Sequence, residues 1–177
     1  MIRKKTVNNT KPNNMKTKKI LLVDDDQDFI VATSTMLNGH GFETELAYSA
    51  EEGYQKTKIF RPDLIILDVH METDNAGLDL CKQLRTDAGF HSVPVIMLTG
   101  IDTISASNQT VDMYREMSKI PGFEINTVLK VRDADGSISV DYKTKSGSVY
   151  FLPLDSFISK PVDFESLLLE VNRFLKE

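Results

Sequence analysis

The stretch that decides the fold is Leu64-Ile65-Ile66-Leu67-Asp68, in which four consecutive apolar residues end in a carboxylic acid. A short continuous apolar run is typical of a strand that is buried on both faces of a sheet. Two further runs have the same form, because residues 20–23 precede Asp24 and residues 93–98 precede Thr99. We therefore expect a parallel sheet in which each central strand ends in a polar residue.

Segments with helical periodicity lie between these strands. Apolar residues recur every three or four positions in three segments: 29–37, 77–85 and 163–176. The last of these is expected to direct six residues inward: Phe164, Leu167, Leu168, Val171, Phe174 and Leu175. A fourth helix should begin at Ser49 and end near Phe60, because Glu52 follows Ser49 at the spacing of a capping box. With two further strands at 43–48 and 157–158, this alternation predicts right-handed βαβ units and a doubly wound α/β domain.

One segment departs from the alternation. Residues 108–119 can form a helix, and from residue 123 onward apolar and polar residues alternate with a period of two. Turns at 133–136 and 146–147 divide this stretch into three short strands. We expect a three-stranded antiparallel meander at about 123–152, inserted before the last parallel strand. It should lie away from the carboxyl ends of the strands and pack on the helix at 108–119.

The composition is that of one compact domain. The 177 residues are 41% hydrophobic and 27% charged, which is ordinary for a folded chain and leaves little length for a separate DNA-binding module. No apolar run reaches the roughly 20 residues that a membrane helix needs. The lone Cys81 fits a reducing, cytoplasmic compartment.

Charge is distributed unevenly along the chain. The net charge is -5, yet residues 1–19 hold basic side chains and no acidic one: Arg3, Lys4, Lys5, Lys11, Lys16, Lys18 and Lys19. A basic arm can contact nucleic acid, but the Asn- and Lys-rich composition favours a solvated tail. We expect residues 1–18 to be a flexible tail and residues 19–177 to form the domain, and we do not expect nucleic acid as a partner.

Polar residues follow the apolar runs at one edge of the predicted sheet: Asp24, Asp25, Asp68, Thr99 and Lys160. Ligands of such sheets bind beyond the carboxyl ends of the strands, so these side chains should share one crevice. Three crowded carboxylates need a counter-charge, and oxygen ligands select Mg²⁺ rather than zinc. Thr99 and Lys160 could then neutralise the oxygens of a phosphoryl group, with Asp68 as the nucleophile.

Four motifs in this order resemble the receiver domain of two-component response regulators. They are Leu21-Leu22-Val23-Asp24-Asp25, Asp63-Leu64-Ile65-Ile66-Leu67-Asp68-Val69-His70-Met71, Pro94-Val95-Ile96-Met97-Leu98-Thr99-Gly100 and Phe157-Ile158-Ser159-Lys160-Pro161. The resemblance covers about residues 18–120 and 154–177, and is to stand-alone, chemotaxis-regulator-like receivers. It implies a flavodoxin-like sheet of five parallel strands in the order 2-1-3-4-5.

The resemblance also implies roles for the acidic residues. Asp68 would be the phosphoacceptor, which receives a phosphoryl group from a histidine kinase or a histidine phosphotransfer protein. Asp25 and Asp68 would bind Mg²⁺ through their side chains. Asp24 would bind it partly through water, and His70 through its backbone carbonyl.

Three further positions match the family's pattern. Thr99 and Lys160 would contact the phosphoryl oxygens, and Phe157 occupies the place of the switch aromatic. The Lys160-Pro161 bond is where receivers commonly hold a cis peptide. The implied function is a cytoplasmic, non-enzymatic signalling switch that acts on an unknown output protein and could self-associate through residues 108–152.

The sequence also departs from the family's pattern beside Asp68. Glu72 stands where receivers usually have a proline after Met71, and the loop that leads to Gly77 is about one residue longer than usual. Gly100 stands where alanine is common. The loop beside the predicted site is therefore particular to this chain.

Two other classes of function stay open at this stage. Asp-nucleophile phosphatases place a general acid two residues after the nucleophile, where this chain has His70, and histidine can act as an acid. A phosphorylation-independent adaptor would act through the inserted meander. The intact set of Asp25, Asp68, Thr99 and Lys160 favours the switch over the adaptor.

Overall fold

The computed structural model of the chain describes residues 16–100, 105–106, 116, 120, 129–132, 138–143 and 149–176. Its main sheet contains five parallel strands: β1 (Lys19–Val23), β2 (Glu43–Ala47), β3 (Leu64–Asp68), β4 (Val95–Thr99) and β9 (Ser156–Ser159). The strands lie in the order β2-β1-β3-β4-β9. This order confirms the predicted doubly wound sheet.

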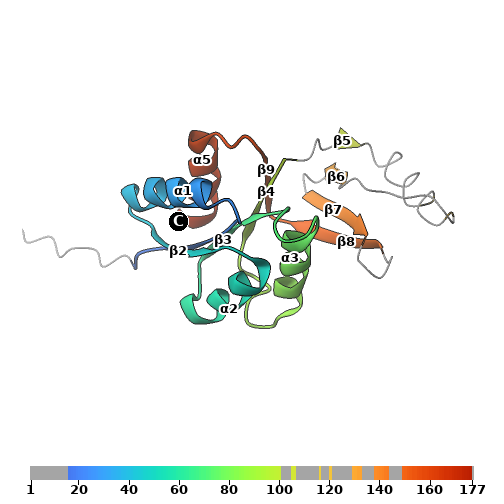
Figure 1. Ribbon diagram of the computed structural model, residues 1–177, viewed down its shortest axis with the longest axis horizontal. Coiled ribbons are helices and arrows are strands. Elements are labelled where there is room, and N and C mark those ends of the chain that lie inside the picture. Colours follow the sequence, from blue (N-terminus) through green and yellow to red (C-terminus); the bar gives the residue numbers. More distant parts are fainter. Residues whose placement is uncertain are drawn as a thin grey trace, which may run out of the picture.

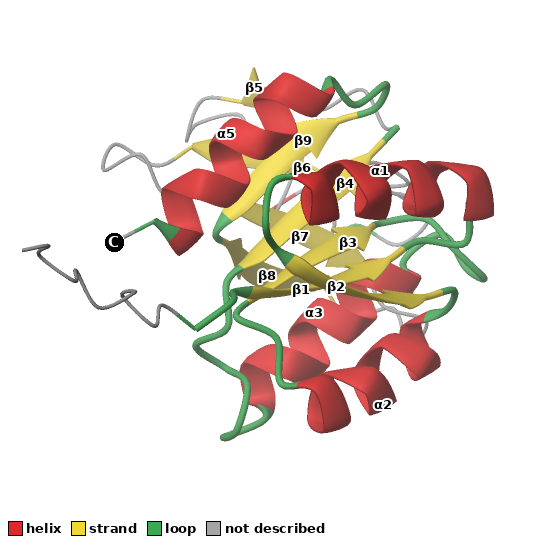
Figure 2. Ribbon diagram, turned by 90° about the vertical axis from the view of Figure 1, so that its left-hand side faces the viewer, coloured by secondary structure: helices red, strands yellow, loops and turns green. Residues whose placement is uncertain are grey.

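Helices cover both faces of this sheet (Figure 1). They are α1 (Gln27–Gly39), α2 (Ala50–Phe60), α3 (Ala76–Thr86) and α5 (Phe164–Leu175). Figure 2 shows α1 and α5 on one face of the sheet and α2 and α3 on the other. The buried residues form two clusters, one for each face. All residues of β3 and β4 are buried, as the continuous apolar runs predicted.

Side-chain caps fix the beginnings of three helices. Asp26, Ser49 and Asp163 each accept a hydrogen bond from the backbone N–H three residues further on. Glu52 accepts the N–H of Tyr48 at 2.8 Å. The predicted capping box is therefore confirmed, although its return bond reaches the residue before Ser49.

The first residue of α5 differs from its prediction. Leu167, Val171 and Leu175 are buried as expected, but Phe164 is 40% exposed. Its ring stacks on Phe29 at the start of α1, with the ring centroids 6.5 Å apart. The helix begins over the first turn of α1 rather than over the sheet, so Phe164 meets a neighbouring helix instead of the core. Across the described residues, no helix is long and apolar enough to span a membrane.

A second sheet precedes β9. It contains β5 (Ser105–Ala106), β6 (Leu129–Arg132), β7 (Ile138–Lys143) and β8 (Val149–Leu154), in that order. The strands β6, β7 and β8 pair antiparallel, which confirms the predicted meander. The short β5 pairs parallel with β6 and was not predicted. The helix expected at 108–119 lies outside the described residues, apart from Glu116, which is helical.

The meander packs on the main domain. Val140, Leu152 and Leu154 belong to the same buried cluster as the apolar residues of α3 and β4. The ammonium of Lys82 on α3 lies 3.1 Å from the ring centroid of Tyr150 on β8, and Figure 1 shows β7 and β8 beside α3. The helix at 108–119, which was expected to cover the meander, lies outside the described residues apart from Glu116, so that expectation stays a prediction. A small antiparallel sheet is stable only when one apolar face is covered, and for these residues the core of the main domain provides that cover.

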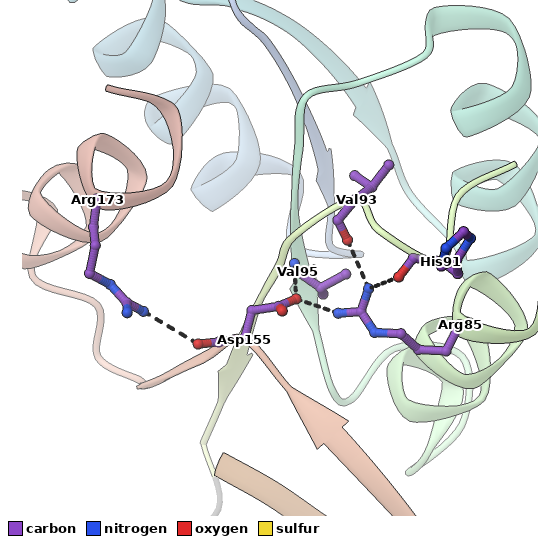
Figure 3. A network of polar contacts seen from close by, with 6 residues as sticks. All are labelled: Arg85, His91, Val93, Val95, Asp155 and Arg173. Atoms are coloured by element: carbon purple, nitrogen blue, oxygen red, sulfur yellow. Dashed lines mark hydrogen bonds and ion pairs between the residues drawn. The ribbon is translucent and has the colours of Figure 1, made fainter. Parts of the chain in front are cut away.

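A single residue, Asp155, joins β8 to β9. Its carboxylate accepts the backbone N–H of Val95 at 2.7 Å and pairs with the guanidinium of Arg85. Arg173 of α5 donates to the backbone carbonyl of Asp155 at 3.3 Å. Figure 3 shows these contacts, which join α3, the start of β4 and α5 at one point. They fix where β9 begins, and β9 leads directly to Lys160.

Candidate functional site

Three carboxylates meet at the carboxyl ends of β1 and β3. Asp24 and Asp25 directly follow β1, and Asp68 is the last residue of β3. One carboxylate oxygen from each lies within 4.8 Å of the others. Asp24 and Asp68 are buried, whereas Asp25 is exposed. The grouping arises because adjacent parallel strands end at the same edge of the sheet.

Lys160 brings a positive charge to the same crevice. Its Nζ lies 2.9 Å from Oδ2 of Asp24 and 3.2 Å from Oδ1 of Asp68. Its backbone N–H donates to the carbonyl of Thr99 at 2.6 Å, and a cis peptide bond joins it to Pro161, as the resemblance implied. One ammonium balances only one of the three carboxylates. The remaining double negative charge and the oxygen donors fit a divalent cation.

Burial is the largest cause and the nearby charge of Asp24 the second, and together they raise the pKa of Asp68, which lies at about 6. Lys160 and His70 oppose this increase. Burial alone would lower the pKa of Lys160, but its hydrogen bond to Asp24 and the charge of Asp68 more than offset this effect and raise the pKa. The crevice therefore has too little positive charge to balance its carboxylates, and the ionised form of Asp68 destabilises the folded state.

The remaining predicted residues surround this cluster. Thr99 is the fully buried last residue of β4 and pairs with Ser159 in the register of β4 and β9. Phe157 pairs with Met97 in the same register and is buried in the cluster on the α2–α3 face. His70 lies two residues after Asp68 and is partly exposed.

Gly77 supports the site and was not predicted to do so. An ideal Cβ atom at this position would lie 1.9 Å from the carbonyl oxygen of Asp68. The backbone N–H of Gly77 donates to the carbonyl of Val69 at 3.1 Å. The absence of a side chain therefore lets the first turn of α3 lie directly against the end of β3.

Glu72 also has a contact that sequence reasoning missed. Its carboxylate oxygens lie 3.1 and 3.4 Å from the backbone nitrogen of Ala50, the first residue of α2. The only signal in the sequence is the departure from proline at this position. That signal marks the loop as particular but does not identify the partner, which is 22 positions away.

The profile of the response regulator receiver domain matches residues 20–119, more than half of the chain. The chain belongs to this family. Receiver domains are typically signalling modules, and the triad of Asp24, Asp25 and Asp68 is typical of their Mg²⁺ site.

Related proteins match this chain over only part of their own length. The DNA-binding response regulator MtrA of Mycolicibacterium smegmatis is 36% identical over 95 residues, which are 54% of this chain and 37% of that protein. Protein RcaC of Microchaete diplosiphon is 31% identical over 91 residues, which are 51% of this chain and 14% of that protein. This receiver therefore spans less than two fifths of the length of these relatives.

Solved structures share the fold at low identity. A putative response regulator from Chloroflexus aurantiacus superposes with a TM-score of 0.59 at 22% identity, covering 92% of this chain and 100% of that one. The chemotaxis response regulator CheY4 of Vibrio cholerae gives the same TM-score and identity, covering 90% of this chain and 100% of that one. These likenesses support the receiver fold alone.

The raised pKa of Asp68 leads to a prediction about stability. A carboxylate whose pKa is raised on folding binds protons more tightly in the folded state, so its contribution to the free energy of unfolding falls as pH rises from 4 to 6. In metal-free buffer at pH 8, Asp68→Asn should therefore be more stable than the wild type by about 1–3 kcal/mol. The two proteins should converge near pH 4.

Urea unfolding followed by circular dichroism at several pH values measures this difference. Asp24 remains 2.9 Å from Lys160 in the variant's expected geometry, so the lysine keeps an ion-pair partner. Equal stability of the two proteins at pH 8 would contradict the electrostatic cost assigned to Asp68.

Proposed function

We propose that this receiver is a phosphorylation-dependent switch whose phosphoacceptor is Asp68. The observation that carries the proposal is the crevice in which Asp68 lies beside two other carboxylates and 3.2 Å from the Lys160 ammonium. A nucleophilic carboxylate, a cation site and a fixed ammonium are the groups that phosphoryl transfer to aspartate requires. The phosphoryl donor would be a histidine kinase or a histidine phosphotransfer protein.

The residues that would hold Mg²⁺ are Asp24, Asp25 and Asp68, together with the backbone carbonyl of His70. When bound, the cation supplies positive charge that offsets the carboxylates and the transferring phosphoryl oxygens. Asp25 and Asp68 would bind it directly and Asp24 partly through water. The charge balance of the crevice supports this assignment, because Lys160 leaves two negative charges uncompensated.

The chain's own groups would carry the transfer. An oxygen of ionised Asp68 attacks the phosphorus of a phosphohistidine, and the P–N bond of the donor breaks. The electron pair of that bond stays on the donor's imidazole, which then takes up a proton. The Lys160 ammonium and the Thr99 hydroxyl hold the phosphoryl oxygens, at the ends of β9 and β4. Because the pKa of Asp68 is about 6, the nucleophile is mostly ionised at neutral pH.

The signal would pass from the crevice to a protein partner. Thr99 and Phe157 lie on the adjacent strands β4 and β9, so a phosphoryl group held by Thr99 could change the packing around Phe157. The output protein would recognise the altered surface, and residues 108–152 could also mediate self-association. We assign the switch to residues 19–177, with the insertion at 123–152, and place it in the cytoplasm. Residues 1–15 of the tail expected at 1–18 lie outside the described residues.

Incubation with acetyl phosphate and Mg²⁺, followed by intact mass measurement, tests this proposal. We expect one phosphoryl group to be added to the wild type and none to Asp68→Asn. Addition of EDTA should abolish the labelling, because the crevice cannot hold the phosphoryl charge without a cation. Labelling of Asp68→Asn, or labelling that EDTA leaves unchanged, would exclude the mechanism.

A further inference from the structure

The loop between β3 and α3 reaches across to α2 through Glu72. Both carboxylate oxygens of this residue lie within hydrogen-bond distance of the Ala50 nitrogen, at 3.1 and 3.4 Å. The contact joins two segments that are 22 residues apart and are not paired through the sheet. Glu72 also occupies the position at which the sequence departs from the proline of its family.

The first turn of α2 is organised around this contact. Ser49 accepts the N–H of Glu52 at 3.2 Å, and Glu52 accepts the N–H of Tyr48 at 2.8 Å. Neither of these bonds uses the N–H of Ala50, which donates to Glu72. A carboxylate is favoured at this end of a helix because the first N–H groups carry a partial positive charge. Glu72 therefore completes the cap of α2 from outside the helix.

The loop also has hydrogen bonds of its own, since the N–H groups of Met71 and Ala76 donate to the carbonyl of Thr73 at 3.4 and 3.2 Å. Two further bonds lie at its base. The N–H of Val69 donates to the carbonyl of Leu98 at 2.9 Å, and the N–H of Gly77 donates to the carbonyl of Val69 at 3.1 Å. Met71 packs against the buried cluster on the α2–α3 face. Glu72 itself is exposed and binds the outer part of the loop to a helix. This part of the loop also carries the His70 carbonyl.

We propose that Glu72 is a positioning residue, which holds the β3–α3 loop on α2 and thereby fixes the His70 carbonyl for the bound cation. This role rests on the proposed function, because it concerns the cation that the switch would bind. Without the Glu72 bond, the cation must order the loop as it binds, which lowers its apparent affinity. The carbonyl of His70 is two residues from Glu72, so a local displacement reaches it directly.

If Glu72 acted only through its negative charge, its variants would differ in Mg²⁺ affinity in another way than if it positioned the loop. Removing any negative charge near the crevice weakens the binding of a cation in the crevice to some extent. Glu72→Gln removes the charge but keeps an oxygen that can accept the Ala50 N–H, whereas Glu72→Ala removes both. Glu51→Gln is the matched control, because Glu51 is exposed in the same turn of α2 and contacts Gln55 on its own helix. Positioning predicts that Glu72→Gln resembles the control, and charge predicts that it resembles Glu72→Ala.

Isothermal titration with MgCl₂ on these three variants and the wild type tests the proposal. We expect about threefold to tenfold weaker binding by Glu72→Ala, and a change of no more than about twofold for Glu72→Gln and Glu51→Gln. Amide hydrogen exchange of residues 69–75 in the metal-free protein should be faster only in Glu72→Ala. Urea unfolding controls for loss of the fold.

The outcomes separate this inference from the proposed function. Wild-type affinity in Glu72→Ala, or equal losses in Glu72→Ala and Glu72→Gln, would overturn the positioning role. Unchanged hydrogen exchange of residues 69–75 in Glu72→Ala would do so without any metal. A wild-type protein that binds no Mg²⁺ would instead overturn the proposed function, and the exchange measurement would still decide whether Glu72 holds the loop.

Discussion

Replacing Gly77 with alanine is expected to destabilise the fold and disable the carboxylate site together. The added Cβ atom would lie 1.9 Å from the carbonyl oxygen of Asp68 and 2.8 Å from its carbonyl carbon. Both are backbone atoms of a strand that is buried along its whole length, so no side-chain rotation can relieve the overlap. Either the first turn of α3 moves outward or the backbone of Asp68 is displaced.

We expect Gly77→Ala to lower the free energy of unfolding by at least about 3 kcal/mol, at the upper end of the usual cost of overpacking. Phosphorylation by acetyl phosphate should slow by at least about tenfold, because a displaced nucleophile loses its alignment. The sequence contains no Trp, so urea unfolding is best followed by circular dichroism. Intact mass at timed intervals gives the rate of phosphorylation.

Gly100→Ala is the matched control for this substitution. It adds the same methyl group next to the same crevice, directly after Thr99, but no atom of the described residues lies within 4 Å of the added atom. We expect its stability to stay within about 0.5 kcal/mol of the wild type. If Gly77→Ala were as stable as Gly100→Ala, α3 would not approach β3 as closely as the structure indicates.

The carboxylate cluster could be predicted because its information is local. Each apolar run ends in a polar residue, and parallel strands place such residues at one edge of the sheet. The sequence therefore indicated that Asp24, Asp25, Asp68 and Lys160 would meet, and the structure brings them together. The roles of Thr99 and Phe157 stay predictions, because the structure establishes their places on β4 and β9 but not what they do.

Contacts between distant backbone atoms could not be predicted in this way. Gly77 reads as the first residue of a helix, and nothing in its neighbours reveals that a carbonyl oxygen lies where its Cβ would be. The bond from Glu72 to Ala50 depends on how a loop and a helix are placed in space, which no spacing encodes. Both residues lie beside the site, where close approach matters most.

The insertion shows the same limit on a larger scale. Its alternating pattern predicted the antiparallel strands β6, β7 and β8, because a period of two identifies one apolar face. The pattern says that this face must be covered but not by what. Its described apolar residues turn out to lie in the core beside α3. The strand β5 has only two residues, which is too short to carry a pattern.

The junction between the insertion and the receiver gives the second large expected effect. Asp155 accepts the N–H of Val95 and pairs with Arg85, whose side chain is only 18% exposed. Arg85 also donates to the carbonyls of His91 and Val93 at 3.0 and 2.8 Å (Figure 3). Asp155→Ala leaves a largely buried guanidinium without its anion and a backbone N–H without its acceptor. We expect the free energy of unfolding to fall by about 2–4 kcal/mol.

Arg173→Met is a control at the same junction. Arg173 pairs with Glu170 on the surface of α5, where its side chain is 54% exposed, and reaches only the backbone carbonyl of Asp155. An exposed ion pair of this kind is worth little, so we expect a loss of less than about 1 kcal/mol. Each variant removes one charged side chain. The difference between their losses of stability therefore reports how much more a largely buried ion pair contributes than an exposed one.

A double-mutant cycle then assigns the loss to the pair itself. Arg85→Met and Asp155→Ala should together cost less than the sum of their separate effects, by about 1–3 kcal/mol, because the second change no longer leaves an unpaired charge. Hydrogen exchange of residues 149–154 should also rise in Asp155→Ala, since the residue that anchors β8 to the start of β4 has lost its bonds. Additive losses, with unchanged exchange in β8, would mean that Asp155 is a passive connection between the sheets. Coupled losses would mean that the pair of Asp155 and Arg85 holds the junction between β8 and β9 against α3 and the start of β4.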